Sequence, residues 1–569
     1  MLRTHFKKQT QNLADMLKSR PELLTLGMVL VFVLLITLKI TAFNYVILPR
    51  QTAEIFRDKF GYTLLIVLIL SPLLMVFKTR KLVITLYVLQ TIYILFNISY
   101  YHYFRTYFNY LELAPILKEG LTAVTHLSAP LSMDMLVAFI DLPIFVYFVM
   151  NYKKIRRLLK KVYLVVILIM AICGGILSII EVDRFQRVSS ILQDIQGFFG
   201  ESKIVESYGT VANAVSKIVE HKDFGLMIRS LKYGAEISGR EANKVRPNFV
   251  IIQVESMDAN VIFQTHNGKY IAPFLHNLSY KSVYYPYVLS YHKGGGTSDV
   301  EFSILNSLQP LDDYPAIKLP NYTYPNSLVR TLLVDGYNPY AYHNNVGAFF
   351  NRDVAFPRMG FKRFLDIKAM DLEDIGWGAP DNDVFNYEID MLKKMRKPFF
   401  TYTITMTSHK PFTNAAHYYK NEAYDDVEDK KTGNYFNSIT YVDQSIRRFV
   451  ENINRSYPNT YIIIVGDHAP DISTEEYQQA SYMSGEQYFE FVPLFIITPD
   501  HQIRIESKEV ASFLDLAPTI LNASGIAYTY KSDGVDLLDE KRLSPPIPLG
   551  DSSYIREVLF QRIKSEPRL

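Results

Sequence analysis

Cysteine is almost absent from this chain of 569 residues, which contains one, Cys173. Because Cys173 lies inside an apolar block, the polar part of the chain after residue 182 can form no disulfide and can use no catalytic cysteine. The charges are nearly balanced, with 60 Lys and Arg against 57 Asp and Glu. Proteins that bind nucleic acids carry a basic surplus, so this balance gives no indication of a nucleic-acid partner.

Long apolar runs are absent after residue 182 but frequent before it. The earlier part contains five apolar blocks, approximately Leu24 to Leu48, Tyr62 to Phe77, Leu82 to Tyr101, Leu131 to Met150 and Val162 to Ile180. Each is close to the roughly 20 residues that a helix needs to cross the core of a bilayer, although the second is at the short end. We therefore expect residues 1–181 to form a five-span transmembrane domain, followed by a soluble domain.

Basic residues in the loops between these blocks predict the orientation in the membrane. The loops on the N-terminal side carry fourteen Lys and Arg, including a cluster at residues 151–161, against five on the opposite side. The N-terminus is therefore expected in the cytoplasm, and five spans would place everything after Ile180 outside the cell. A cleaved signal peptide explains the first block poorly, because the block is longer than an h-region of about 7 to 15 residues.

Residues 182–245 are expected to form a polar helical connector, followed by a catalytic domain at 246–540 and a C-terminal tail at 541–569. In the connector, Ala212 and Ala214 form a small-residue pattern of the kind that signal peptidases cut. We hypothesise that some molecules are cut after Ala214. An ordinary amphipathic helix is the alternative, and the distance of about thirty residues from the fifth block favours it.

Short aliphatic strands alternate with amphipathic helices in the exported part. The segments expected as strands are RPNFVIIQVES, PFFTYTITMTSHKPF, NTYIIIVGDHA and FVPLFIITPD, and those expected as helices include TYPNSLVRTLLVDG, GNYFNSITYVDQSIRRFVENI and SFLDLAPTILNAS. This alternation predicts an α/β fold with a mostly parallel central sheet. In such folds, ligands bind beyond the carboxyl ends of the strands.

Polar residues stand at or near the ends of these strands. Glu255 follows the first strand, and Asp467 and His468 follow the aliphatic run IIIVG, although an ordinary turn could explain the latter two. Thr297 follows three consecutive glycines at the expected start of a helix, where backbone N–H groups favour an anion. Thr297 is therefore either an N-cap residue or a nucleophile.

These four residues would form a donor set suited to a divalent cation. Two carboxylates and a threonine oxygen favour Mn²⁺ or Mg²⁺, while the imidazole keeps Zn²⁺ open. A metal or a base must lower the pKa of a hydroxyl group before it becomes a nucleophile at neutral pH. A phosphorus ester suits such a site best, because the metal and the helix N-terminus both stabilise charge on its oxygens.

The order of these motifs resembles the lipoteichoic acid synthase family within the alkaline phosphatase and sulfatase superfamily. The shared elements are the glutamate at the first strand, GGTSDVEF, HKPF, GDH and a late DLAPTIL helix, together with five preceding apolar blocks. The resemblance implies a sulfatase-like catalytic domain in which Glu255, Thr297, Asp467 and His468 bind the metal. Because the donors are mostly oxygen, Mn²⁺ is the first choice. It also implies that Thr297 is the nucleophile.

The same resemblance implies the contacts with the substrate. His409 in SHKPF would contact the phosphate, and His343 and Arg352 in the segment YHNNVGAFFNRDVAFPRMGF would contact the phosphate or the glycerol. Phe350 stands where the family typically has a tryptophan, and Asn344-Asn345 replaces its Gly-Asp. These departures bear on which lipid headgroup the site binds more than on the type of reaction.

The resemblance implies a glycerophosphotransferase of the bacterial cell membrane that works outside the cell in lipoteichoic acid and cell-wall synthesis. Its donor would be phosphatidylglycerol, its acceptor a glycolipid or a polyglycerol phosphate chain, and its by-product diacylglycerol. A phosphoethanolamine transferase is the alternative, but such enzymes typically carry several exported disulfides. Sulfatase activity would need Cys or Ser in a C/S-x-P-x-R pattern, which the exported part lacks. The loop around Trp377, the only tryptophan, resembles a family loop of packing importance.

Overall fold

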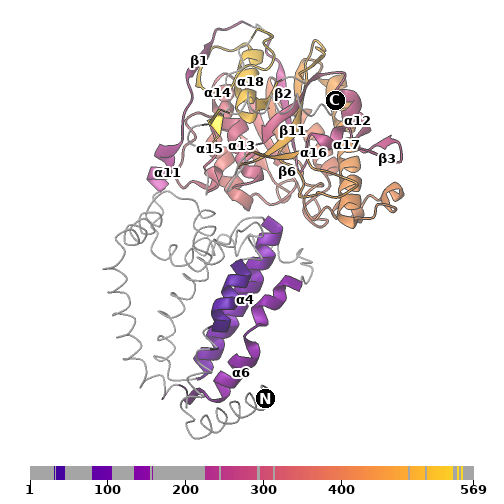
Figure 1. Cartoon of the computed structure of the whole chain (residues 1–569). Coiled ribbons are helices and arrows are strands. Elements are labelled where there is room, and N and C mark those ends of the chain that lie inside the picture. The colour runs from indigo at the N-terminus through magenta and orange to yellow at the C-terminus, as the bar shows by residue number, and fades with distance from the viewer. Residues whose placement is uncertain are drawn as a thin grey trace. The chain divides into compact units, whose positions relative to one another are not determined.

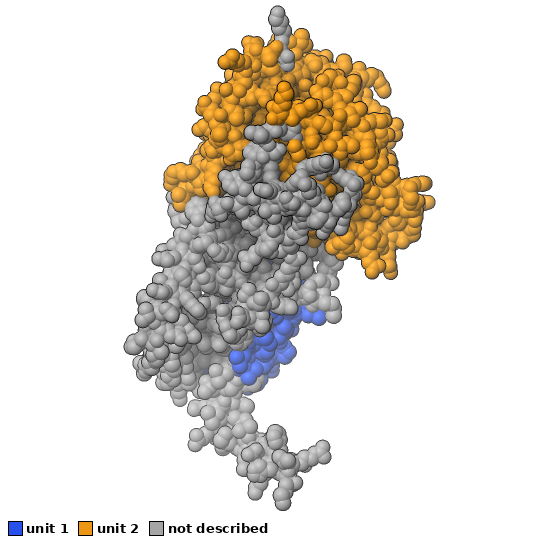
Figure 2. Space-filling view, turned by 45° about the horizontal axis from the view of Figure 1, so that its top comes forward, with its two compact units in different colours: residues 1–222 blue, residues 223–569 orange. Residues whose placement is uncertain are grey.

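The computed structural model describes residues 31, 34–44, 80–104, 133–153, 155, 157, 224–242, 245–290, 295–311, 314–484, 487–506, 509–541, 548–549 and 553–554. The chain divides into two compact units, Met1–Lys222 and Asp223–Leu569, which are coloured separately in Figure 2. Cys173, the Ala212–Ala214 pattern, Gly294 and the second and fifth predicted spans lie outside the described residues.

Among the described residues of the first unit, one helix is long and apolar enough to cross a membrane. It is α4 (Arg80–Phe104), whose apolar window Arg80–Ile98 has a mean hydropathy of 1.6 and coincides with the third predicted span. Two shorter apolar helices, Leu34–Asn44 and Met135–Met150, coincide with parts of the first and fourth predicted spans. A total of five spans stays a prediction.

The fourth apolar block is not one continuous α-helix. It forms the 3₁₀ helix η3 (Met133–Phe139) and then α6 (Leu142–Met150), which has a proline in its first turn and Asp141 at its N-cap position. Proline is tolerated at this place because the first N–H groups of a helix have no partner within the helix. Asp141 is fully buried, and its Oδ2 atom lies 2.8 Å from Nζ of the equally buried Lys39. The apolar blocks therefore enclose an ion pair.

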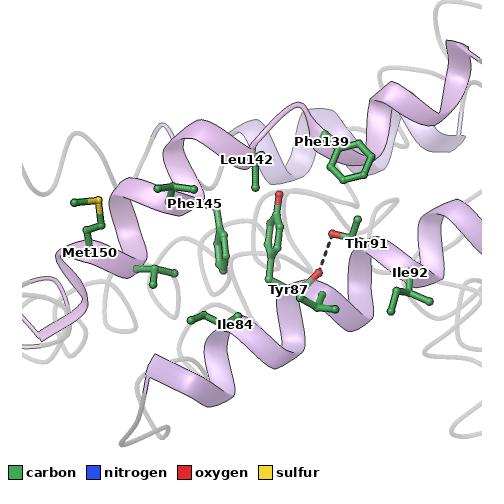
Figure 3. A pocket seen from close by; sticks show the side chains of 11 residues that line it. Ile84, Tyr87, Thr91, Ile92, Phe139, Leu142, Phe145 and Met150 are labelled. Carbon is green, nitrogen blue, oxygen red and sulfur yellow. Dashed lines mark hydrogen bonds between the residues drawn. The ribbon is translucent and has the colours of Figure 1, made fainter.

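A groove of about 490 Å³ lies between α4 and α6 (Figure 3). The ring of Tyr87 on α4 stacks on that of Phe145 on α6, with 3.6 Å between the ring centroids. The Tyr87 hydroxyl also donates a hydrogen bond of 2.8 Å to Asp141 Oδ1. These two contacts tie α4 to the start of α6. The groove is lined by Ile84, Tyr87, Val88, Thr91, Ile92, Phe139, Leu142, Phe145, Val146, Val149 and Met150.

The second unit contains the strands and helices of the domain that the sequence analysis expects to be exported. Its described strands are β1 (Glu236–Gly239), β2 (Asn248–Val254), β3 (Thr265–His266), β4 (Lys269–Tyr270), β5 (Val283–Ser290), β6 (Asn338–His343), β7 (Arg363–Leu365), β8 (Phe399–Ile404), β9 (Thr460–Gly466), β10 (Ser481–Ser484), β11 (Gln487–Ile497), β12 (Arg504–Ile505), β13 (Ala511–Ser512), β14 (Tyr528–Lys531), β15 (Pro548–Leu549) and β16 (Ser553–Tyr554). Its described α-helices are α11 (Phe224–Ser230), α12 (Pro273–Leu278), α13 (Thr297–Asn306), α14 (Leu328–Val334), α15 (Arg352–Met359), α16 (Asp381–Leu392), α17 (Lys430–Ser456) and α18 (Leu516–Ser524).

A ten-stranded sheet forms the centre of this unit (Figure 1). Its main order is β12-β5-β11-β9-β2-β8-β6-β7, with β10 paired to β11 and β13 to β5. The strands from β9 to β7 pair in parallel, as the alternating pattern predicts. The predicted strands at β2, β8, β9 and β11 and the predicted helices at α14, α17 and α18 are confirmed.

The sheet is mostly parallel, as predicted, but one strand runs in the opposite direction. β11 lies between β5 and β9 and runs antiparallel to both, so the sheet is mixed. A parallel return requires a crossover, usually a helix, whereas no helix lies between β9 and β11 in the described residues and β10 leads into β11 as an antiparallel pair. The aliphatic composition of β11 marks it as a strand but carries no information on its direction.

Two hydrophobic layers cover the two faces of the sheet. Successive side chains of a strand point to opposite faces, so Phe249 of β2 joins one layer and its neighbour Val250 joins the other. Helices α13, α14, α15 and α18 cover the first face, and α12, α16 and α17 cover the second. Both faces of the central strands are therefore buried, which explains why these strands read as continuous aliphatic runs.

The chain from Phe224 onward packs with the second unit. β1 pairs antiparallel with β14, and Leu231 lies in the hydrophobic layer over the first face. The described part of the expected connector, residues 224–242, is thus included in the same compact unit as the sheet. Pairing between strands almost three hundred residues apart is not visible as a local pattern in the sequence.

Candidate active site and metal centre

The ends of β2 and β9 bring the two predicted carboxylates together. These strands pair in parallel with Val254 opposite Gly466, so the residues that follow them, Glu255 and Asp467, lie at the same edge of the sheet. One ligand atom each from Glu255, Asp467 and His468 lie within 4.8 Å of one another. Gly466 permits this approach, because a side chain there would collide with the carbonyl oxygen of Met257.

Thr297 is the first residue of α13 and faces this cluster. Its hydroxyl donates a hydrogen bond of 3.2 Å to Glu255 Oε2. The N-cap residue is Gly296, whose φ of +51° is accessible to glycine and unfavourable for most other residues. The structure thus resolves the alternative in which Thr297 is an N-cap residue: Thr297 lies inside the helix and directs its hydroxyl to the carboxylate.

Backbone amides hold one oxygen of Asp467 and leave the other available. Asp467 Oδ1 accepts hydrogen bonds from the N–H groups of Ser256, at 2.8 Å, and His468, at 2.7 Å. Asp467 Oδ2 is buried and has no hydrogen-bond partner. An unsatisfied buried carboxylate oxygen is unfavourable, and its position next to a second carboxylate fits a divalent cation as its partner.

The charges of the cluster shift the pKa values of all three groups. Burial and then the charge of Glu255 raise the pKa of Asp467 well above its ordinary value. Burial also opposes ionisation of Glu255, but His409 and His468 outweigh it and hold its pKa low. Burial alone would lower the pKa of His468, but Asp467 and Glu255 raise it well above its ordinary value. The two carboxylates thus compete for one imidazolium, and a divalent cation fits this donor set.

His409 lies at the same edge, in the loop after β8, which is the other parallel neighbour of β2. Its Nδ1 atom lies 2.7 Å from the carbonyl oxygen of Lys410, so Nδ1 carries the proton when the ring is neutral. Burial lowers the pKa of His409, against the attraction of Glu255. The ring packs on Trp377, with 5.0 Å between the ring centroids. The sequence reading assigned the Trp377 loop to packing, and the ring of Trp377 packs here against a candidate site residue.

Arg352 and His343 are close together but are not free groups on a pocket wall. Arg352 forms a buried ion pair with Glu301 of α13, with Nε donating to the two carboxylate oxygens at 3.1 and 2.9 Å. Arg352 Nη1 lies 3.1 Å from Nε2 of His343. Burial and then the neighbouring guanidinium lower the pKa of His343 well below its ordinary value, so this histidine is neutral and accepts the hydrogen bond at Nε2.

Glu301 is a site residue that the sequence reading missed. It belongs to the motif GGTSDVEF and lies four residues after Thr297 on α13, and residues four apart share one face of a helix. This spacing was the available signal. One helix face therefore presents both the candidate nucleophile and the carboxylate that holds Arg352.

Two of the three residues that depart from the family pattern have structural explanations. Phe350 adopts a φ of +53°, which is unfavourable for an aromatic residue, and its ring centroid lies 5.2 Å both from Arg352 Cζ and from Lys318 Nζ. Asn344 is fully buried, and its side chain bonds Ala379 and Asp381. Phe350 thus makes cation–π contacts, one of them with the candidate site residue Arg352, and Asn344 makes buried hydrogen bonds.

Comparison with known proteins supports the assignment of this unit. The sulfatase family model matches residues 247–526, which include the sheet and the candidate metal ligands. Over these residues the chain is similar to sulfatases. In the sulfatase-like domain, the predicted α/β fold is confirmed with the mixed sheet described above.

Two curated relatives belong to the family named from the sequence. Lipoteichoic acid synthase 2 of Bacillus subtilis (strain 168) is 26% identical over 326 residues, which cover 54% of this chain and 49% of that protein. Lipoteichoic acid synthase of Staphylococcus aureus (strain USA300) is 28% identical over 331 residues, covering 54% and 50%. The predicted resemblance to lipoteichoic acid synthases is confirmed. The chain spans about half the length of the curated relatives that it matches.

A solved membrane protein shares the fold over most of the chain. The integral membrane protein lipooligosaccharide phosphoethanolamine transferase A of Neisseria meningitidis aligns with a TM-score of 0.54 and 15% identity. The alignment covers 89% of this chain and 98% of that one. At this identity the likeness concerns the fold alone.

Proposed function

We propose that the chain is a membrane-anchored glycerophosphotransferase that takes glycerol phosphate from phosphatidylglycerol and adds it to a growing polyglycerol phosphate chain. The observation that carries this proposal is the position of Thr297, whose hydroxyl points at Glu255 beside the unsatisfied oxygen of Asp467. The names of the curated relatives support the substrate class.

In the first half-reaction, Thr297 Oγ1 forms a bond to phosphorus while the bond from phosphorus to the diacylglycerol oxygen breaks. Diacylglycerol leaves, and the glycerol phosphate remains on Thr297. In the second half-reaction, the terminal hydroxyl of the acceptor attacks the same phosphorus and frees Thr297. Glu255 orients the threonine hydroxyl through the 3.2 Å hydrogen bond.

Glu255, Thr297, Asp467 and His468 would hold a divalent cation, for which we propose Mn²⁺, with Mg²⁺ or Zn²⁺ as alternatives. When bound, the cation would lower the pKa of the threonine hydroxyl and stabilise charge on the phosphate oxygens.

For the headgroup we propose contacts with His409, His343, Arg352 and Phe350. His409 carries its proton on Nδ1 when the ring is neutral, and we propose that this ring contacts the phosphate of the headgroup. Arg352 uses Nε and Nη2 to bind Glu301 and Nη1 to bind His343, so we propose that one of its remaining N–H bonds contacts a phosphate oxygen. The headgroup would thus bind between two rigid, buried elements.

For the arrangement of the chain in the membrane, we propose the topology predicted from the sequence. We propose five spans in residues 1–181, a cytoplasmic N-terminus, a connector at 182–245, an extracellular catalytic domain at 246–540 and a tail at 541–569. The apolar helix α4 supports membrane anchoring. A lipid donor is presented at the bilayer surface, and an anchor keeps the catalytic domain close to it.

Purified full-length protein tests the function directly. The protein is incubated with Mn²⁺ and either fluorescent phosphatidylglycerol or fluorescent phosphatidylethanolamine, and diacylglycerol is measured. Release from phosphatidylglycerol alone supports the proposal. Release only from phosphatidylethanolamine would favour the alternative phosphoethanolamine transferase, for which the present support is a shared fold.

A further inference from the structure

Asp381 is a buried carboxylate that bonds the loop carrying His409. It is the first residue of α16 and is 1% exposed. Its Oδ1 atom accepts hydrogen bonds from the backbone N–H groups of Met406, at 2.9 Å, and Thr407, at 3.2 Å. These two residues follow β8 and lead directly into His409.

The same oxygen atom also bonds a second loop. Asp381 Oδ1 accepts a hydrogen bond of 2.7 Å from the side-chain amide of Asn344, the residue that follows His343 at the end of β6. Asn344 in turn is fixed to Ala379, because its side-chain amide donates to the Ala379 carbonyl at 2.8 Å and its own carbonyl accepts from the Ala379 N–H at 2.9 Å. Trp377, which packs on His409, is in the same short loop as Ala379.

An ordinary role in starting α16 does not explain this arrangement. Asp and Glu are common in the first turn of a helix, where they interact with the N–H groups of that helix. Asp381, however, directs its side chain to N–H groups of another loop, and the N-cap residue Pro380 makes no side-chain cap. The side chain therefore holds two strand-end loops at the site instead of its own helix.

Burying the polar side chains of this network is energetically unfavourable, because two of their atoms form no hydrogen bond. Asp381 Oδ2 and Asn344 Oδ1 are both buried and without a hydrogen-bond partner. Burial raises the pKa of Asp381 to about 6, although four hydrogen bonds oppose that shift. Partly satisfied buried polar groups are costly to a fold, and here every bond made goes to the loops beside the candidate site.

We propose that Asp381 is a positioning residue that, together with Asn344, sets the places of His409 and His343 around the headgroup. This inference rests on the proposed function, in which both histidines contact the headgroup. It assigns a task to Asn344, one of the three residues that depart from the family pattern. A shift of the 406–409 loop would move His409 against Trp377 and against the phosphate.

Two substitutions of Asp381 separate positioning from charge. Asp381→Asn keeps the Oδ1 acceptor for all three donors and removes the charge, whereas Asp381→Ala removes the acceptor. We expect Asp381→Ala to lower the kcat of diacylglycerol release at least 30-fold and Asp381→Asn to stay within about threefold of the parent chain. Equal losses in both variants, or no loss in Asp381→Ala, would overturn the inference.

Asp443 provides a matched control for a purely structural effect. It is also 1% exposed, has a pKa raised to about 6 by burial, and accepts hydrogen bonds from two backbone N–H groups, those of Phe274 at 3.0 Å and Leu275 at 2.8 Å. Those bonds hold α12 and none of the candidate site residues. Asp443→Ala is expected to retain kcat within about threefold. A loss as large as that in Asp381→Ala would show that general destabilisation explains both.

A measurement that does not depend on enzyme activity tests the positioning role of Asp381 independently of the proposed function. Hydrogen exchange of residues 404–412 is measured on the full chain in detergent, for the parent and the three variants. We expect exchange at Met406 and Thr407 to rise at least tenfold in Asp381→Ala and to stay unchanged in Asp381→Asn and Asp443→Ala. Unchanged exchange in Asp381→Ala would overturn the positioning role. Absence of diacylglycerol release from the parent chain would overturn the proposed function and leave this result standing.

Discussion

At the residue scale, Thr297 is the first position to test. Because its side chain does not cap α13, Thr297→Ala should lower the free energy of unfolding by less than about 1 kcal/mol. Diacylglycerol release should nevertheless fall by roughly a thousandfold or more, since the nucleophile is removed. Both quantities are measured on the full chain, with the exposed Thr265→Ala as the control. More than a trace of release from Thr297→Ala would contradict the nucleophile assignment.

The unsatisfied oxygen of Asp467 leads to a prediction about metal binding. After removal of metal with a chelator, activity should be lost, and Mn²⁺ should restore it best because the donors are mostly oxygen. Mn²⁺ at a hundred times its Kd should also stabilise the chain by about 2.7 kcal/mol.

Asp467→Asn is the variant that checks this mechanism. Its amide relieves the repulsion between two buried carboxylates, so the metal-free variant should melt at the same or a higher temperature than the metal-free parent. Added Mn²⁺ should no longer raise its Tm. If Mn²⁺ stabilises parent and variant equally, the ion binds elsewhere.

Glu388 provides a pH-dependent prediction away from the site. It is fully buried on α16, its Oε2 accepts a hydrogen bond of 2.6 Å from Thr403, and burial raises its pKa to about 7. A raised pKa in the folded state means that folding favours the protonated form. The stability contributed by Glu388 is thus fully present below about pH 4.5 and is lost as the pH rises toward 7.

Glu388→Gln should remove this loss. The variant should match the parent near pH 4.5 and exceed its stability by up to about 3 kcal/mol at pH 8, as judged by thermal unfolding at both values. Glu451, an exposed carboxylate paired with Arg447, is the control, and Glu451→Gln should change stability by less than about 0.5 kcal/mol at either pH. A benefit of Glu388→Gln that is equal at both pH values would exclude the titration of Glu388 as its cause.

At the scale of elements, the ion pair between Lys39 and Asp141 joins the helix Leu34–Asn44 to the start of α6. Breaking a buried pair leaves one charge without compensation, so Asp141→Ala should destabilise the chain in detergent by roughly 3 to 5 kcal/mol. Replacing both partners, Lys39→Met with Asp141→Leu, should recover most of that loss. Thermal unfolding of the full chain measures this. Equal destabilisation in the single and double variants would mean that the pair does not act as a unit.

The elements of the second unit show how the positions of the candidate site residues follow from strand pairing. β8, β2 and β9 are parallel neighbours, so the residues after each strand meet at one edge of the sheet. Helix α13 then adds Thr297 at its first position and Glu301 one turn later. Three loops and one helix start thus form the candidate site, and none of them needs to be adjacent to another in the sequence.

At the scale of the whole molecule, the prediction to test is whether cleavage of the connector releases a soluble fragment from the membrane. If some molecules are cut after Ala214, a soluble fragment should start at Val215, should keep its metal site and should not turn over lipid in a bilayer. N-terminal sequencing of any protein in the medium identifies the start. Full-length protein in the membrane, with no fragment in the medium, would contradict the cleavage hypothesis and favour an ordinary helix at this position.

The sequence by itself determined the local features of this protein. Aliphatic runs marked β2, β8, β9 and β11, and amphipathic periods marked α14, α17 and α18. These features depend on hydrophobic patterning within one segment, which is visible without the fold. The motif order also pointed to the sulfatase-like domain that the family match confirms.

Only the tertiary structure decided the features that join distant segments. The antiparallel direction of β11, the ion pair of Glu301 with Arg352 and the contact of Trp377 with His409 all link parts of the chain that no local pattern connects. The bonds from Asp381 to the loops of His343 and His409 are of the same kind. Hydrophobic periodicity states which side of a segment is buried but not which segment lies against it, so the partners of a buried charge emerge only when the sheet and its helices pack.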